Sequence, residues 1–165
     1  AFFFVLAFYR VVEQTWHRVS SVKHTRKIPC RSPSTQTVAA ALVLYWGALC
    51  IGTHLPGGFV GTPMVSDKML HFLAYTGLSF LIAMLLPLLG IRDSRVYLTA
   101  LLIAVGYGAI DELGQIPIPG RNADAVDWLA DVAGAVAGVT CYRLMVGAMA
   151  CQPFGFRGQK KPSPP

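Results

Sequence analysis

The sequence predicts an all-α membrane protein, a bundle of about four transmembrane helices with both termini in the cytoplasm. Of its 165 residues, 54% are hydrophobic and only 13% are charged, whereas a soluble domain carries about 25% charged residues. The mean hydropathy is +0.52. The apolar residues gather into four runs, and most lysines and arginines lie in the segments that flank them.

The first two apolar runs are long enough to cross a membrane and have clear ends. Residues 38–55 carry no formal charge and are followed by the helix-ending sequence Pro56-Gly57-Gly58. Residues 69–90 follow Ser66 and Asp67, either of which can cap the first turn of a helix. We therefore expect the first two spans at about 38–55 and 67–90.

The third apolar run is too short to cross a bilayer by itself. Residues 96–110 cover only about 22 Å at 1.5 Å per residue, and the hydrocarbon core is about 30 Å thick. The helix must therefore continue through Asp111, Glu112 and Gln115, which gives a third span at about 96–115 and places two acids below the headgroups.

The fourth run has the same property. Residues 132–142 are again too few, so we expect this helix to begin near residue 125 and to span about 125–147. Asp127 and Asp131 then lie in its first two turns.

The lysines and arginines predict the orientation, because cytoplasmic loops are enriched in these residues. Six precede the first span, two lie between the second and third spans, and four follow from Arg143 onward, so twelve of fourteen fall on one side. Only Lys68 and Arg121 fall on the other side. An even number of spans in the cytoplasmic (inner) membrane, with both termini inside, follows from this count.

The remaining segments are expected to be cytoplasmic flanks of a transmembrane domain at 38–150. Residues 1–37 form a basic N-terminal segment that begins with a short apolar stub, and 151–165 form a basic, proline-rich tail. The net charge of +6 belongs to these flanks and is not interleaved with aromatic residues, so we do not expect nucleic-acid binding. The four cysteines form no CxxC pair, which argues against a zinc knuckle or redox motif.

This topology brings three polar stretches to the outer end of the bundle. The first is Asp67-Lys68-x-x-His71-Phe72-x-x-Tyr75, in which Asp67, His71 and Tyr75 share one helix face. The second is Tyr107-x-x-x-Asp111-Glu112-x-x-Gln115. The third is Pro119-Gly120-Arg121, followed by the stripe Asp127, Asp131, Gly134 and Gly138. A carboxylate without a partner in a bilayer costs at least ~2.5 kcal/mol. We therefore expect these acids to be paired, hydrated, protonated or metal-bound, and Lys68, Arg121 and His71 are the available partners.

The order of these motifs resembles the VanZ-like family over about residues 38–147. The matching residues are Asp-Lys-x-x-His-Phe-x-x-Tyr, then Tyr-Gly-x-x-Asp-Glu-x-x-Gln, then Pro-Gly-Arg and a later Asp with a Gly-x-x-x-Gly stripe. The position of Asp131 is more often Asn in that family. The resemblance implies a cell-envelope membrane protein of a family named for low-level resistance to teicoplanin, a lipid-tailed glycopeptide antibiotic.

Three functional hypotheses remain open from the sequence. The polar cluster can be a structural clasp in which Lys68 and Arg121 neutralise the acids and lock the outer ends of the helices, including in a protein that supports a partner. It can instead be a site that binds an amphiphile of the envelope, or part of a membrane-embedded acid–base or metal-dependent enzyme that acts on a lipid-linked substrate. We favour an amphiphile, either a lipid-linked cell-wall precursor or a lipoglycopeptide, because polar heads and apolar walls suit it. Its binding residues are predicted to be Asp67, Lys68, His71, Tyr75, Gln115, Arg121, Asp127 and Asp131.

The enzyme hypothesis assigns acid–base roles to His71, Asp111 and Glu112, with metal binding by His71 and carboxylates as a variant. No hydrolase or zinc-protease motif is present, so we predict no cofactor and no metal, and we do not favour catalysis. The expected partners are membrane lipids, the envelope amphiphile and, in a homo-oligomer, further copies of the chain. We expect Tyr45, Trp46, Trp128 and Tyr142 to anchor the helices at the membrane interfaces.

Overall fold

The computed structural model describes residues 34–55, 66–121 and 123–150. The N-terminal segment with its apolar stub, the loop at 56–65 and the C-terminal tail were assigned from the sequence and lie outside the described residues.

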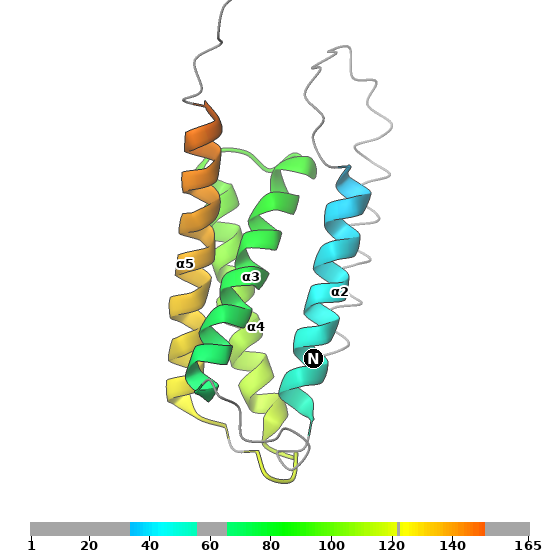
Figure 1. Ribbon diagram of the computed structural model, residues 1–165, viewed down its shortest axis with the longest axis vertical. Coiled ribbons are helices and arrows are strands. Elements are labelled where there is room, and N and C mark those ends of the chain that lie inside the picture. The colour runs from blue at the N-terminus through cyan, green and yellow to red at the C-terminus, as the bar shows by residue number, and fades with distance from the viewer. Residues whose placement is uncertain (1–33, 56–65, 122, 151–165) are drawn as a thin grey trace, which may run out of the picture.

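Four helices make up the described part of the chain, and each is long and apolar enough to cross a membrane. Figure 1 shows them side by side and alternating in direction. The predicted all-α class and the four spans are therefore confirmed, while the cytoplasmic position of both termini stays a prediction. The helices are α2 (Thr35–His54), α3 (Asp67–Leu88), α4 (Ser94–Gln115) and α5 (Ala125–Ala150).

Local sequence signals explain where the helices begin and end. Ser34 and Ser66 cap α2 and α3, because their hydroxyl oxygens accept the backbone N–H groups of Thr37 and Met69. Beyond α3, Gly90 adopts a φ of +90°, and the N–H of Ile91 donates to the carbonyl oxygen of Leu86 at 3.1 Å. This closing turn requires the left-handed conformation that glycine adopts without strain, so the chain reverses into α4 at this point.

The outward faces of the helices are apolar, and the polar side chains are inside. Large hydrophobic residues such as Leu44, Leu102, Leu113 and Leu144 are all more than half exposed. By contrast, His71, Ser79, Asp111, Glu112, Gln115, Asp127 and Asp131 are buried. A soluble protein has the opposite arrangement, with apolar residues inside and polar residues outside. The arrangement seen here fits a bundle surrounded by lipid, in which polar groups face one another.

Helices α3 and α5 run in the same direction and pack most closely, through the predicted glycine stripe. A Cβ atom at Gly134 would collide with the carbonyl oxygen of Phe72, and one at Gly138 would collide with that of Thr76. Small residues let two helix backbones approach in this way. Among the described elements α2 is more peripheral, since it packs on α3 and α4 but not on α5.

The expected interfacial role of Trp46 is wrong. Its side chain is fully buried in the core and packs edge-on against Tyr107, with 5.0 Å between the ring centroids. The residue lies near the middle of α2, where an inward-facing indole fills the space between α2 and α4 instead of reaching a headgroup region.

The glycine stripe predicts that a methyl group added at Gly134 destabilises the bundle, whereas one added at Gly147 does not. Gly134→Ala should destabilise the bundle by about 1–3 kcal/mol, because the helices must separate to admit the methyl group. Gly147→Ala in the same helix is the control, since a Cβ there meets nothing within 4 Å. Thermal unfolding in detergent checks both variants. Equal stability of the two variants would contradict the close α3–α5 contact.

Candidate functional site

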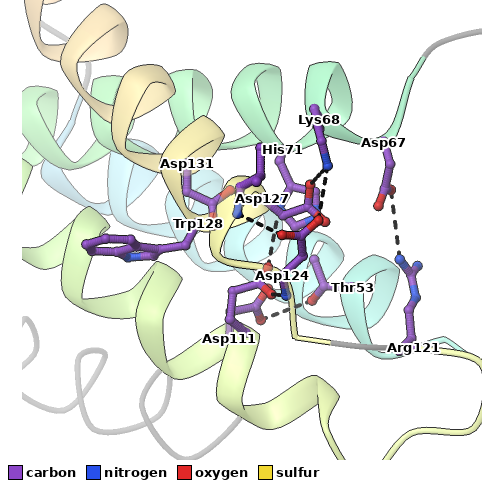
Figure 2. Close-up of polar contacts among 12 residues, drawn as sticks. Thr53, Asp67, Lys68, His71, Asp111, Arg121, Asp124, Asp127, Trp128 and Asp131 are labelled. Carbon is purple, nitrogen blue, oxygen red and sulfur yellow. Dashed lines mark hydrogen bonds and ion pairs between the residues drawn. The ribbon is translucent and has the colours of Figure 1, made fainter.

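The polar residues converge at the end of the bundle where α3 and α5 begin and where α2 and α4 end (Figure 2). In α3, α4 and α5 the predicted i, i+4 spacings place the polar side chains on one face of each helix, and α2 adds Thr53 and His54 at its end. The cluster therefore contains groups from four helices and from the segment before α5.

The centre of the cluster joins α3, α4 and α5. His71 Nδ1 lies 2.9 Å from Asp131 Oδ1 and 3.9 Å from Glu112 Oε1. The Asp131 side chain is fully buried, and those of His71 and Glu112 are at most 8% exposed. Glu112 uses its other oxygen to accept the backbone N–H of Asp124 at 3.0 Å. One carboxylate thus holds the imidazole ring, and the second ties α4 to the start of α5.

Asp111 is the most enclosed acid of α4. Its Oδ1 accepts hydrogen bonds from the Thr53 hydroxyl at 3.0 Å and from the Tyr107 hydroxyl at 3.3 Å. The Nδ1 atom of His54 lies 3.6 Å from the same oxygen. The end of α2 is therefore attached to α4 through polar contacts.

Lys68 forms an ion-pair network at the rim of the cluster. Its Nζ lies 2.8 Å from Asp127 Oδ1 and 3.2 Å from Asp124 Oδ2. The carboxylate of Asp124 also accepts the Val126 N–H at 2.8 Å. This backbone bond, followed by Lys68, lowers the pKa of Asp124. The ionised Asp124 carboxylate therefore stabilises the folded chain fully above the pKa that Asp124 has in the unfolded chain. This stabilisation is lost as pH falls through the lowered pKa of Asp124 in the folded chain.

Arg121 lies apart from the central acids, on the side of α2 (Figure 2). Its Nη1 is 3.9 Å from Asp67 Oδ1, and its other nitrogens donate to the carbonyl oxygens of Leu55 and Gly52, each at 3.4 Å. Gly120 precedes it with a φ of +78°, which a glycine accommodates without strain. The loop thereby turns the guanidinium back over the end of α2.

Several buried polar atoms of the cluster have no hydrogen-bond partner among the described residues. An unpaired buried polar group costs about 1–3 kcal/mol, and a charged one costs more. The atoms are Tyr75 OH, Asp111 Oδ2, Glu112 Oε1, Gln115 Nε2 and Asp131 Oδ2.

A pocket of about 530 Å³ lies beside the cluster, between α2 and α3 and the Gly120-Arg121 turn. Volumes of about 300–1,000 Å³ are typical of small-molecule sites. Apolar and polar residues both line it. The lining residues are Leu49, Gly52, Thr53, Leu55, Asp67, Leu70, His71, Ala74, Tyr75, Gly120 and Arg121.

The structure distributes the predicted site residues among these contacts. Asp67, His71, Tyr75 and Arg121 line the pocket, whereas Lys68 and Asp127 pair with each other outside it. Asp131 supports His71, and Gln115 is buried without lining the pocket. In the clasp hypothesis, Lys68 and Arg121 neutralise the acids of α4 and α5. In the described structure only Asp127 has such a partner.

Thr53 and His54 in α2 were not predicted from the sequence to belong to the cluster, nor was the pairing of Asp124 with Lys68. The first two form a polar dipeptide at the end of an otherwise apolar run, and that position was a usable signal. Asp124 had a weaker signal, because an acid just before a helix is also common when it only caps the first turn.

The Lys68–Asp127 pair predicts a charge-specific loss of stability. Lys68→Met should lower the melting temperature in detergent, because the mostly buried Asp127 carboxylate loses its basic partner. Adding Asp127→Asn to this variant should restore part of the loss. Arg95→Met, which removes an exposed cation at the opposite end, is the control. A similar change in Lys68→Met and Arg95→Met would argue against the pair.

Comparison with known proteins agrees with this architecture. No curated protein and no solved structure matches the chain significantly. A family model described as VanZ/LLP1 matches residues 1–146, which includes the N-terminal segment that the motifs did not cover. The motifs, the four membrane-spanning helices and a match over most of the sequence lead to one conclusion: the chain belongs to the VanZ/LLP1 family.

Proposed function

We propose that this VanZ-like membrane protein binds an amphiphilic ligand of the cell envelope in the pocket between α2 and α3. The polar end of the bundle faces the outside of the cytoplasmic membrane in this proposal. The ligand is a lipid-linked cell-wall precursor or a lipoglycopeptide antibiotic such as teicoplanin.

The observation that carries the proposal is the mixed lining of the pocket. Leu49, Leu70 and Ala74 supply apolar walls from α2 and α3, while His71 and Arg121 supply polar groups at the end of the same space. An amphiphile needs this combination, because its chain gains from apolar contact and its head requires hydrogen bonds or charge.

Arg121 is the residue that best suits an anionic head group. Its contacts of 3.4 Å to carbonyl oxygens and 3.9 Å to Asp67 are longer than the 2.7–2.9 Å typical of strong charge-assisted bonds. Exchanging them for a bidentate contact with phosphate or carboxylate therefore costs little. Lys68 is less suitable, because two carboxylates already hold it within 3.2 Å.

A substitution that fills the pocket tests the proposal. Gly52 lines the pocket, and a Cβ at this position meets nothing within 4 Å, so the Gly52→Leu side chain begins in open space and reduces the volume left for a ligand. We expect at least a tenfold loss of affinity for a fluorescent polyprenyl diphosphate or for teicoplanin, each measured with protein in detergent micelles. Gly47→Leu is the matched control, because it adds the same side chain to open space on α2 outside the pocket.

The outcomes separate the three hypotheses. Binding to the wild type and to Gly47→Leu but not to Gly52→Leu supports the proposed site. Equal affinity of all three proteins, or no affinity in the wild type, would contradict it and favour the structural clasp. Conversion of the bound diphosphate to a new product would instead support the enzyme hypothesis.

The orientation of the bundle is tested separately in intact cells. Single cysteines replace the exposed residues Ala123 and Ser94, which lie at opposite ends, in a chain without its native cysteines. A membrane-impermeant thiol reagent should label Ala123→Cys before permeabilisation and Ser94→Cys only afterwards. The reverse pattern would place the polar end in the cytoplasm and exclude an external ligand.

A further inference from the structure

Three side chains from three helices place possible metal ligands close together. One ligand atom from each of His71, Glu112 and Asp131 lies within 4.8 Å of the other two, and all three residues are buried. They come from the first turns of α3, the last turn of α4 and the second turn of α5. This set of one imidazole and two carboxylates is not a chance surface cluster, because its three residues are buried and come together only when the three helices pack.

An unpartnered oxygen points into this set. Glu112 Oε1 is buried, has no hydrogen-bond partner in the part of the chain that the structure describes, and lies 3.9 Å from His71 Nδ1. Its residue is only 6% exposed. Asp131 Oδ2 is also buried without a partner, although its other oxygen bonds to the imidazole. Two carboxylate oxygens therefore retain unused lone pairs beside the same imidazole.

The charges around the set indicate a missing cation. Asp111, Glu112 and Asp131 are three buried acids in one region. Within the described residues, no lysine or arginine forms an ion pair with any of them, because Lys68 pairs with Asp124 and Asp127 and Arg121 pairs with Asp67. A divalent cation would balance two of these three charges, whereas His71 alone balances at most one.

We propose that His71, Glu112 and Asp131 bind one divalent transition-metal cation. Imidazole nitrogen favours Zn²⁺ over Ca²⁺ and Mg²⁺, which prefer oxygen ligands throughout, and the two carboxylates also suit Mn²⁺. A cation on His71 Nδ1 displaces the proton from that atom: a neutral ring then carries its proton on Nε2, and an imidazolium releases one proton to solvent. The inference does not rest on the proposed amphiphile, because the three ligands come from the chain itself.

A second set shares His71 but is less suited to hold a cation. Asp67, His71 and Asp127 also have ligand atoms within 4.8 Å of one another. The Asp67 side chain is 55% exposed, and Asp127 is already neutralised by Lys68 at 2.8 Å. The buried set keeps unpartnered oxygens, and we therefore assign the cation to it.

Metal binding to the purified full chain tests the inference. After treatment with EDTA and its removal, the protein in detergent is titrated with Zn²⁺ or Mn²⁺ by calorimetry, and its melting temperature is measured with and without metal. We expect one cation per chain and a raised melting temperature. Glu112→Gln and Asp131→Asn should weaken binding at least tenfold. Asp93→Asn should bind like the wild type, because Asp93 lies at the opposite end of the bundle, before α4, and Asn has nearly the same size and shape as Asp.

Failure of the wild type to bind either cation, or unchanged binding in Glu112→Gln and Asp131→Asn, would overturn the inference. If both variants fail to fold, the X-ray absorption spectrum of the Zn²⁺-loaded wild type decides. Imidazole scattering with first-shell nitrogen and oxygen at about 2.0–2.2 Å supports the site, and a spectrum without imidazole refutes it. Neither result depends on whether a polyprenyl diphosphate or teicoplanin binds to the pocket.

Discussion

Carboxylates inside a lipid-surrounded bundle need partners that the bundle itself supplies. Lipid offers no hydrogen bonds, so each ionised group must find a donor or a cation on another helix. Asp111 is held by Thr53 of α2, Asp131 by His71 of α3, and Asp127 by Lys68 of α3. These contacts join α2 to α4 and α3 to α5 at one end of the bundle, and Glu112 of α4, 3.9 Å from His71 of α3, links the two pairs. The pocket lies where α2 meets that end.

The close packing of α3 and α5 makes these contacts geometrically specific. Phe72 faces Gly134 and Thr76 faces Gly138, so the register repeats after one helical turn along two parallel helices. A shift by one residue would rotate the side chains by about 100° and turn Asp131 away from His71. Apolar contact with lipid cannot supply this precision, because lipid chains fit any apolar helix surface equally well.

Much of this architecture was predictable from the sequence, for a physical reason. The short apolar runs at 96–110 and 132–142 required their helices to include Asp111 and Asp127, and the structure places both in those helices. The partners were not predictable, because helix rotation about its axis depends on side-chain packing. Arg121 therefore lies over α2 instead of the central acids, and Trp46 is buried in the core. The pocket, formed between two helices and a loop, had no signal in the sequence.

The positions of the partners along the chain also bear on how the protein is made. Thr53 precedes Asp111, and Lys68 and His71 precede Asp127 and Asp131. Ribosomes synthesise from the N-terminus, so each of these three acids enters the membrane when its side-chain partner has already been made. The three acids lie in α4 and α5, the last two of the described helices, and each has its side-chain partner in an earlier helix. Chain order thus limits the exposure of unpaired charge during insertion.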